Sequence, residues 1–167
     1  MKKLLKKAKK GFTLVELVVV IAIIAILSAA SVATYFGVTE SARKSNVGST
    51  ASQIGQLVYL ASIDGDDSDL VTTKDGYVVF LKASDGGKLV NTTSETEAKA
   101  SLVALLSNNS LTVAKEELTL AYKGEEEKVT VKSITYTSST YNYKATINFG
   151  AEAGGAYSVT ATEKVSK

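Results

Sequence analysis

Cysteine and histidine are both missing from this chain of 167 residues. Without cysteine, no disulfide can stabilise the protein and no thiolate can serve as a nucleophile or metal ligand. Without histidine, the commonest general base and metal-ligating side chain is also unavailable. The sequence contains no Gly-rich phosphate loop either. It therefore offers no catalytic set, and it predicts a protein that is not an enzyme and that has no cofactor.

Positive charge is scarce outside the first residues of the chain. Six lysines precede residue 11, and no acidic residue accompanies them: Lys2, Lys3, Lys6, Lys7, Lys9 and Lys10. The whole chain carries a net charge of +2, but residues 12–167 hold 13 Lys and Arg against 17 Asp and Glu, a net charge of −4. The basicity thus belongs to the N-terminal segment, and the composition does not predict a nucleic-acid surface.

A long charge-free stretch follows this basic start. No charged residue occurs from Leu17 through Thr39, a run of 23 residues. A helix of that length spans about 35 Å, which exceeds the hydrocarbon core of a bilayer at about 30 Å. Because lysines stay on the cytoplasmic side, we expect the chain to be exported beyond residue 40.

Glu16 is a lone acid at the start of this apolar stretch. A carboxylate inside a membrane helix costs a few kcal/mol near the centre and less near an end, so it needs a cationic partner. The helix itself offers no such partner nearby. An ordinary secretory signal, with small residues at 28–30 and 31–33 for cleavage, and a plain signal anchor are the simplest alternatives. Ordinary signals, however, avoid a glutamate at the start of their apolar region.

The run KGFTLVE at residues 10–16, with the apolar residues 17–27 behind it, resembles the class III signal of type IV pilins and pseudopilins. Five residues in order carry the resemblance: Gly11, Phe12, Thr13, Leu14 and Glu16. The resemblance implies that a membrane peptidase cuts after Gly11 and that Phe12 is then N-methylated. It also implies a salt bridge in the assembled form, between Glu16 and the Phe12 amine of a neighbouring subunit.

The same resemblance implies a structural subunit of a type IV pilus. The precursor would span the cytoplasmic membrane once, in contact with lipid, and would then join a homo-oligomeric helical filament on the cell surface. Its implied partners are the prepilin peptidase, which is also the methyltransferase, a platform protein and an assembly ATPase. A pseudopilin of a type II secretion or DNA-uptake machine is one alternative. A membrane-anchored or secreted binding domain is another.

Residues 12–63 are predicted to form one long helix, apolar over 12–39 and amphipathic over 40–63. The amphipathic half presents an apolar stripe at helical spacing: Val47, Ala51, Ile54, Val58 and Ala61, with Leu57 beside them. At positions where many pilins carry a helix-breaking glycine or proline, this chain has Ala25 and Ala33. Alanine favours helix, so we expect the helix to be continuous.

The remaining residues, 64–167, are predicted to form a globular β-rich head. A short helix is expected over 95–107, with Ser94 as its N-cap and Glu97 three residues on. Alternating patterns predict strands over 76–81, 117–123, 128–137, 140–149 and 157–165. An antiparallel sheet covered by the helix stripe would give an α+β fold, the lollipop shape of pilins.

Clustered aspartates follow the predicted long helix. Asp64, Asp66, Asp67 and Asp69 could bind a hard cation such as calcium. With Ser68 they follow part of an EF-hand, but Asp69 replaces its glycine and Asp75 its glutamate, so a solvated acidic loop is favoured. Two Asn-x-Ser/Thr triplets begin at Asn91 and Asn108; we interpret them as chance occurrences in a Ser/Thr-rich domain.

Overall fold

The computed structural model describes residues 11–64, 71–74, 77–83, 89–91, 94–122, 130–150 and 157–166. The chain divides into two compact units, which are Met1–Ser41 (unit 1) and Ala42–Lys167 (unit 2). One helix contributes to both units.

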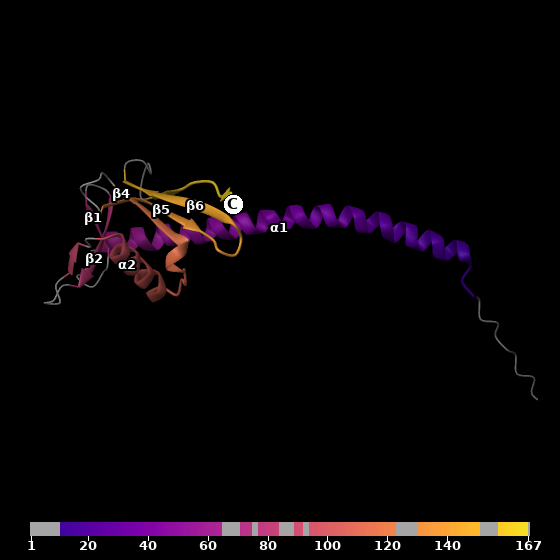
Figure 1. Ribbon diagram of the computed structural model, residues 1–167, viewed down its shortest axis with the longest axis horizontal. Helices are drawn as coiled ribbons and strands as arrows, with labels where there is room; N and C mark the ends of the chain where they lie inside the picture. The colour runs from indigo at the N-terminus through magenta and orange to yellow at the C-terminus, as the bar shows by residue number, and fades with distance from the viewer. Residues whose placement is uncertain are drawn as a thin grey trace, which may run out of the picture. The chain divides into compact units, whose positions relative to one another are not determined.

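The long helix predicted from sequence is confirmed. Helix α1 runs from Leu14 to Asp64 without interruption, a length of 51 residues (Figure 1). It begins two residues later than predicted and passes through Ala25 and Ala33, as expected of good helix formers.

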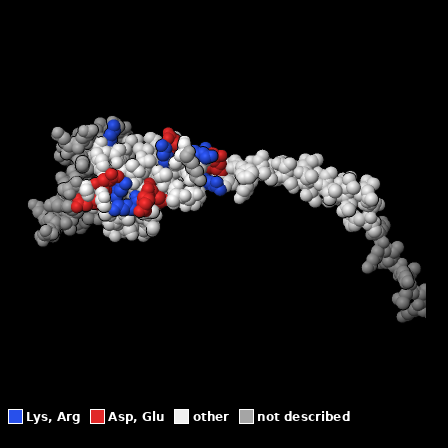
Figure 2. All heavy atoms as spheres, viewed as in Figure 1, with Lys and Arg blue, Asp and Glu red and all other residues white. Residues whose placement is uncertain are grey.

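In unit 1, α1 exposes all of its large apolar side chains. The exposed fractions of those between Leu14 and Val38 range from 48% to 78%, and Figure 2 shows this stretch free of charged atoms on the face in view. The helix is long and apolar enough to cross a membrane, with a mean hydropathy of 2.7 in its most apolar window. Nothing in the described part of the chain covers this surface.

In unit 2, α1 buries the stripe predicted from its sequence. Val47, Ala51, Ile54 and Val58 are each at most 1% exposed, and Leu57 and Ala61 are partly buried against the same core. These side chains pack with the buried faces of the strands and of a second helix. The stripe therefore forms one wall of the hydrophobic core of unit 2.

All strand pairings in the sheet are antiparallel. The strands are β1 (Val71–Lys74), β2 (Tyr77–Ala83), β3 (Leu89–Asn91), β4 (Leu118–Tyr122), β5 (Thr130–Thr137), β6 (Tyr143–Phe149), β7 (Tyr157–Val159) and β8 (Glu163–Lys164). Strand β5 is central, because Ile134 pairs with Leu120 of β4 on one edge and with Ile147 of β6 on the other.

Alternation along the strands produces one buried face. In β6 the buried residues are Tyr143, Ala145, Ile147 and Phe149, and the residues between them are only partly buried. This is the period-two pattern expected of a sheet with one face on the core. A long N-terminal helix and a C-terminal antiparallel sheet make the protein α+β, a pilin-like arrangement.

The second helix, α2 (Glu95–Asn108), also forms as predicted and ends one residue later. The Ser94 hydroxyl accepts a hydrogen bond from the Glu97 backbone N–H at 3.3 Å, which confirms the predicted N-cap. Its apolar side packs into the core through Ala98, Leu102, Leu105 and Leu106.

Two strand predictions are wrong in detail. Residues 140–142 form a turn instead of the start of β6, and Asn142 has a positive φ of 55° that no regular strand contains. The predicted strand 157–165 is divided into β7 and β8. The division follows from Thr160, whose N–H donates to the Thr146 carbonyl at 2.8 Å while its hydroxyl accepts from the Thr146 N–H at 3.0 Å.

Strands β1 and β3 were not predicted at all. A short 3₁₀ helix, η1 (Lys115–Glu117), also precedes β4, where the prediction placed the first strand residue at 117. The acidic run at residues 125–127, whose sequence favours a solvated hairpin tip, lies outside the described residues.

The C-terminal segment lies directly against α1 where the helix carries glycine. A Cβ built on Gly55 would come within 2.5 Å of the Tyr157 ring, and one on Gly48 would lie 3.2 Å from the Thr162 hydroxyl. The Tyr157 hydroxyl donates to the Ser52 carbonyl at 3.2 Å, and the Thr162 hydroxyl donates to a helix carbonyl one turn before Gly48. Glycine by itself weakens a helix. At positions 48 and 55, however, it allows the C-terminal segment to pack closely against α1.

Candidate processing and assembly site

The peptide bond between Gly11 and Phe12 lies just before the first helical residue. Gly11, Phe12 and Thr13 are exposed and have no regular secondary structure, and 87% of the Phe12 side-chain surface is accessible. A bond outside a helix has backbone groups that a peptidase can reach. The predicted cleavage point is therefore accessible in this structure.

Nothing in the described chain requires residue 11 to be glycine. A Cβ added at Gly11 would meet no atom within 4 Å, and its backbone is not in the left-handed region that favours glycine. This contrasts with Gly55, where the fold itself leaves no room. The glycine at position 11 is consistent with a requirement imposed by a partner that binds this segment.

Thr13 and Glu16 together cap the N-terminus of α1. The Thr13 N–H and hydroxyl both donate to Glu16 Oε2, at 2.9 Å and 2.8 Å, and the Glu16 N–H donates to the Thr13 hydroxyl at 3.2 Å. This is a capping box, in which two otherwise unpaired backbone N–H groups are satisfied reciprocally. The pattern Thr-x-x-Glu ahead of an apolar run is the sequence signature of such a box, although only a cationic partner was predicted for Glu16.

The capping box leaves Glu16 with one oxygen for another partner. Both bonds from Thr13 go to Oε2, and within the described residues Oε1 has no hydrogen bond. The Thr13 N–H belongs to the Phe12–Thr13 peptide bond, which cleavage after Gly11 would not break. The same box can hold the carboxylate before and after processing. The predicted salt bridge between Glu16 and a neighbour's Phe12 stays a prediction.

Comparison with known proteins identifies the N-terminal segment. Residues 6–32 match the prokaryotic N-terminal methylation motif. This stretch is a class III signal. The motif supports a precursor like those of type IV pilins and pseudopilins, and it implies processing by a prepilin peptidase. The apolar start of α1 and the signal fit a precursor anchored in the membrane by one span. No curated protein and no solved structure matches the chain.

The calcium candidates fall mostly outside the described residues. Asp66, Asp67 and Asp69 are among the residues that the structure does not describe, and Asp64 is known only as the last residue of α1. Across the described ranges, no three acidic side chains gather closely enough to hold a metal ion. Asn108 is exposed at the end of α2, and Asn91 closes β3.

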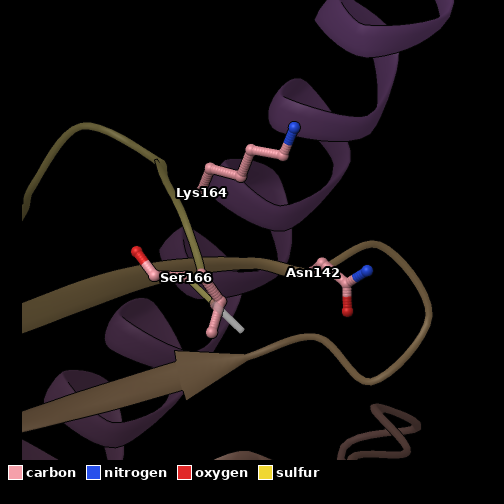
Figure 3. A pocket seen from close by; sticks show the side chains of 4 residues that line it. Asn142, Lys164 and Ser166 are labelled. Carbon is pink, nitrogen blue, oxygen red and sulfur yellow. The ribbon is translucent and has the colours of Figure 1, made fainter.

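A shallow pocket near the C-terminus is lined by Asn142, Lys164, Val165 and Ser166. Figure 3 shows the polar ends of Asn142, Lys164 and Ser166 pointing in three different directions. A ligand site typically has a few polar groups that converge, and these three do not.

The perturbed titratable groups of unit 2 have structural explanations. Burial raises the pKa of Tyr122 to about 12, with a smaller contribution from the Glu95 carboxylate, and it also raises the pKa of Tyr136. Burial alone would raise the pKa of Glu117, but hydrogen bonds from Ser139 and Ala114 outweigh it and lower the pKa. Each of these shifts is thus explained by burial or by hydrogen bonds within the fold of unit 2.

Proposed function

We propose that this protein is a structural subunit of a type IV pilus that is cut after Gly11, N-methylated on Phe12 and assembled into a helical surface filament. The observation that carries the proposal is the apolar helix in unit 1, whose large side chains are all exposed from Leu14 to Val38. Such a helix needs lipid or other apolar helices around it. Before assembly that partner is the membrane, and after assembly it is a bundle of identical helices.

Glu16 has a defined task in this assembly. Cleavage creates an amine at Phe12, and the capping box leaves one carboxylate oxygen of Glu16 without a described partner. Inside packed helices an unpaired charge is expensive, and a charge pair is stronger than in water. A bond between Glu16 of one subunit and Phe12 of the next satisfies both groups at once.

The chain divides by role under this proposal. Residues 1–11 are the cytoplasmic leader that is removed, and 12–39 are the membrane span that becomes the filament core. Residues 40–63 are the exported half of the helix, and 64–167 form the head. The partners are the prepilin peptidase and methyltransferase, a platform protein, an assembly ATPase and further copies of the chain.

Substitution of Glu16 tests the assembly step. Glu16→Ala should leave cleavage after Gly11 intact and should leave membrane insertion unchanged or improved. Filament yield should fall sharply, because each added subunit would bury an unpaired amine. Sheared surface filament, measured against total mature protein by immunoblot and electron microscopy, gives the result. A normal filament yield from Glu16→Ala would reject the salt bridge.

Two further variants separate charge from helix capping. Glu16→Gln retains the capping box, since glutamine also caps at this position, but it cannot neutralise an amine. Thr13→Ala removes the hydroxyl and leaves the charge in place. The proposal expects the loss of filament to be severe in Glu16→Gln and mild in Thr13→Ala. The reverse order would mean that capping, and not charge pairing, is what assembly requires.

Deletion of the whole chain distinguishes a pilus from a secretion or DNA-uptake machine. A pilin deletion should remove a filament that can be sheared from the surface. Loss of protein secretion or DNA uptake, from cells that never carry such a filament, would identify a pseudopilin instead.

A further inference from the structure

The apolar span of α1 carries its aromatic residues at one end. Between Leu17 and Thr39 the only aromatic residues are the adjacent pair Tyr35 and Phe36. They are 68% and 66% exposed, and their ring centroids lie 6.1 Å apart in an edge-to-face arrangement. Because neighbouring helix positions point in different directions, the two rings cover a broad arc of the helix surface.

The position of this pair along α1 matches the thickness of a bilayer. Tyr35 follows Glu16 by 19 residues of continuous helix, which corresponds to about 29 Å at the usual rise per residue. The hydrocarbon core of a bilayer is about 30 Å thick. When the Glu16 carboxylate lies at the cytoplasmic interface, both rings lie at the opposite interface. This is the level at which tyrosine is enriched in the aromatic belts of membrane proteins.

Two of the three hydroxyl side chains between Leu17 and the aromatic pair are suited to hydrocarbon, because they are paired within the helix. Ser31 and Thr34 donate to the carbonyls of Leu27 and Ala30, at 2.7 Å and 3.2 Å. Their polar hydrogens are thus satisfied within the helix, as the absence of water in a bilayer core demands. The first charged residue after the span, Glu40, comes only after the rings.

We propose that Tyr35 and Phe36 anchor α1 at the outer lipid–water interface, and that they set its depth once the leader has been removed. In the precursor, six lysines hold the cytoplasmic end of the helix. Cleavage after Gly11 takes all six away, and at that end only the Phe12 amine and Glu16 remain charged. The aromatic pair then becomes the main determinant of depth. This rests on the membrane-bound stage of the proposed function and does not depend on filament assembly.

The absence of native cysteine allows a direct measurement of depth. Single cysteines are introduced by Ala33→Cys or Thr39→Cys in the full-length chain, in cells that lack an assembly ATPase, and are labelled with a membrane-impermeant maleimide. The cysteine at 39 should react and the one at 33 should be protected. Tyr35→Leu with Phe36→Leu keeps the apolar area of the pair. Leucine, however, prefers the hydrocarbon core, whereas the aromatic pair prefers the interface. Labelling at 39 should then fall severalfold in the mature protein.

The control variants are matched to the aromatic pair. Val32→Leu with Val38→Leu adds aliphatic bulk beside the rings but retains both of them. This change should leave the labelling at position 39 as it is. Gly11→Val should keep the leader on the chain. In this uncut protein, Tyr35→Leu with Phe36→Leu should lower the labelling at position 39 less than it does in the mature protein.

Each outcome has a defined meaning. Unchanged labelling of the double leucine variant, in protein that resists carbonate extraction, would reject the anchor. An equal shift in cut and uncut protein would reject the role of the leader lysines. Protein that carbonate extracts would instead contradict the membrane stage of the proposed function, which is a separate failure.

Discussion

The two halves of α1 have the same secondary structure and opposite surroundings. In unit 1, Ile24 is 56% exposed, whereas in unit 2 Ile54 is fully buried. The front half is apolar on every side and exposed, whereas the rear half buries an apolar stripe in the core that the sheet and α2 also form. Full burial of one such side chain contributes about 1.5–3 kcal/mol relative to exposure. Unit 2 therefore gains stability from its own core, and unit 1 must obtain it from lipid or from other copies.

The sharpest way to test this contrast is to remove the front half. A fragment that begins at Glu40 should be soluble, folded and monomeric, because among its described residues only Leu60 and Ile63 are large apolar side chains left on the surface. The full chain should require detergent or lipid. Size-exclusion chromatography and circular dichroism would show this. An aggregated or unfolded fragment would mean that unit 2 depends on unit 1 for its stability.

The next largest effect is expected at Ile54. Ile54→Asp in this fragment should lower the free energy of unfolding by several kcal/mol, since it places an unpaired charge in the core. Ile63→Asp is the matched control, because Ile63 is 55% exposed on the same helix and the change should cost about 0.5 kcal/mol or less. Thermal melts of the two variants give the comparison. Equal melting temperatures would show that the Ile54 face is not in a core.

Gly55 should be less tolerant than Gly48. Gly55→Ala places a Cβ 2.5 Å from the Tyr157 ring and 3.0 Å from Ile147, and we expect a loss of about 1–3 kcal/mol by overpacking. At Gly48 the nearest atom is a hydroxyl at 3.2 Å, so the gain in helix propensity of about 1 kcal/mol should nearly offset the contact. Urea denaturation measures both. A Tyr157→Ser change should restore part of the stability of Gly55→Ala, and no restoration would mean that the ring is not the obstacle.

The smallest effect on the free energy of unfolding is expected at Glu117, and this effect should depend on pH. Its carboxylate accepts hydrogen bonds from the Ser139 N–H and hydroxyl, at 2.8 Å and 2.6 Å, which ties the β5–β6 turn to η1. The lowered pKa means that this stabilisation is present above the unfolded pKa of about 4.3 and is lost as the pH falls through the folded value. Because Glu117 is only partly buried, we expect Glu117→Gln to cost about 1 kcal/mol at pH 7.

The control for this experiment is Glu116→Gln, one residue earlier in η1. It removes the same charge and should change the stability little. At a pH well below 4, Glu117→Gln should be as stable as the unmodified fragment. If Glu117→Gln lowers the free energy of unfolding by the same amount at both pH values, the ionised carboxylate is not what holds the turn.

The sequence predicted those parts of the fold that depend on local patterns. Helical spacing identified the stripe around Ile54, and period-two alternation identified the buried side of β6. The docking of the C-terminal segment could not be predicted, because Gly48 and Gly55 indicate only a weaker helix until their partners in space are known. Strands β1 and β3 are too short to give a pattern, and Thr160 divides the last strand by a contact with Thr146 on β6.

The candidate site was predicted from the order of its residues alone, and its roles in cleavage, methylation and assembly stay predictions. Gly11, Phe12 and Glu16 follow in an order that matches a known motif, so their neighbours in space were not needed. The role of Thr13 was missed, although the spacing of a capping box was present in the sequence. The reason is physical: a short polar side chain beside an exposed helix end has several possible partners, and only coordinates show which one it takes.

The mass and N-terminal sequence of the mature protein test the central claim most directly. Cleavage after Gly11 predicts a chain that begins with Phe12 and carries one additional methyl group on its amine. Gly11→Val should leave an uncut, lysine-tailed precursor in the membrane. A mature chain that begins near Ser31 or Thr34 would show that an ordinary signal peptidase has removed the segment, and would contradict the account of the front half of α1.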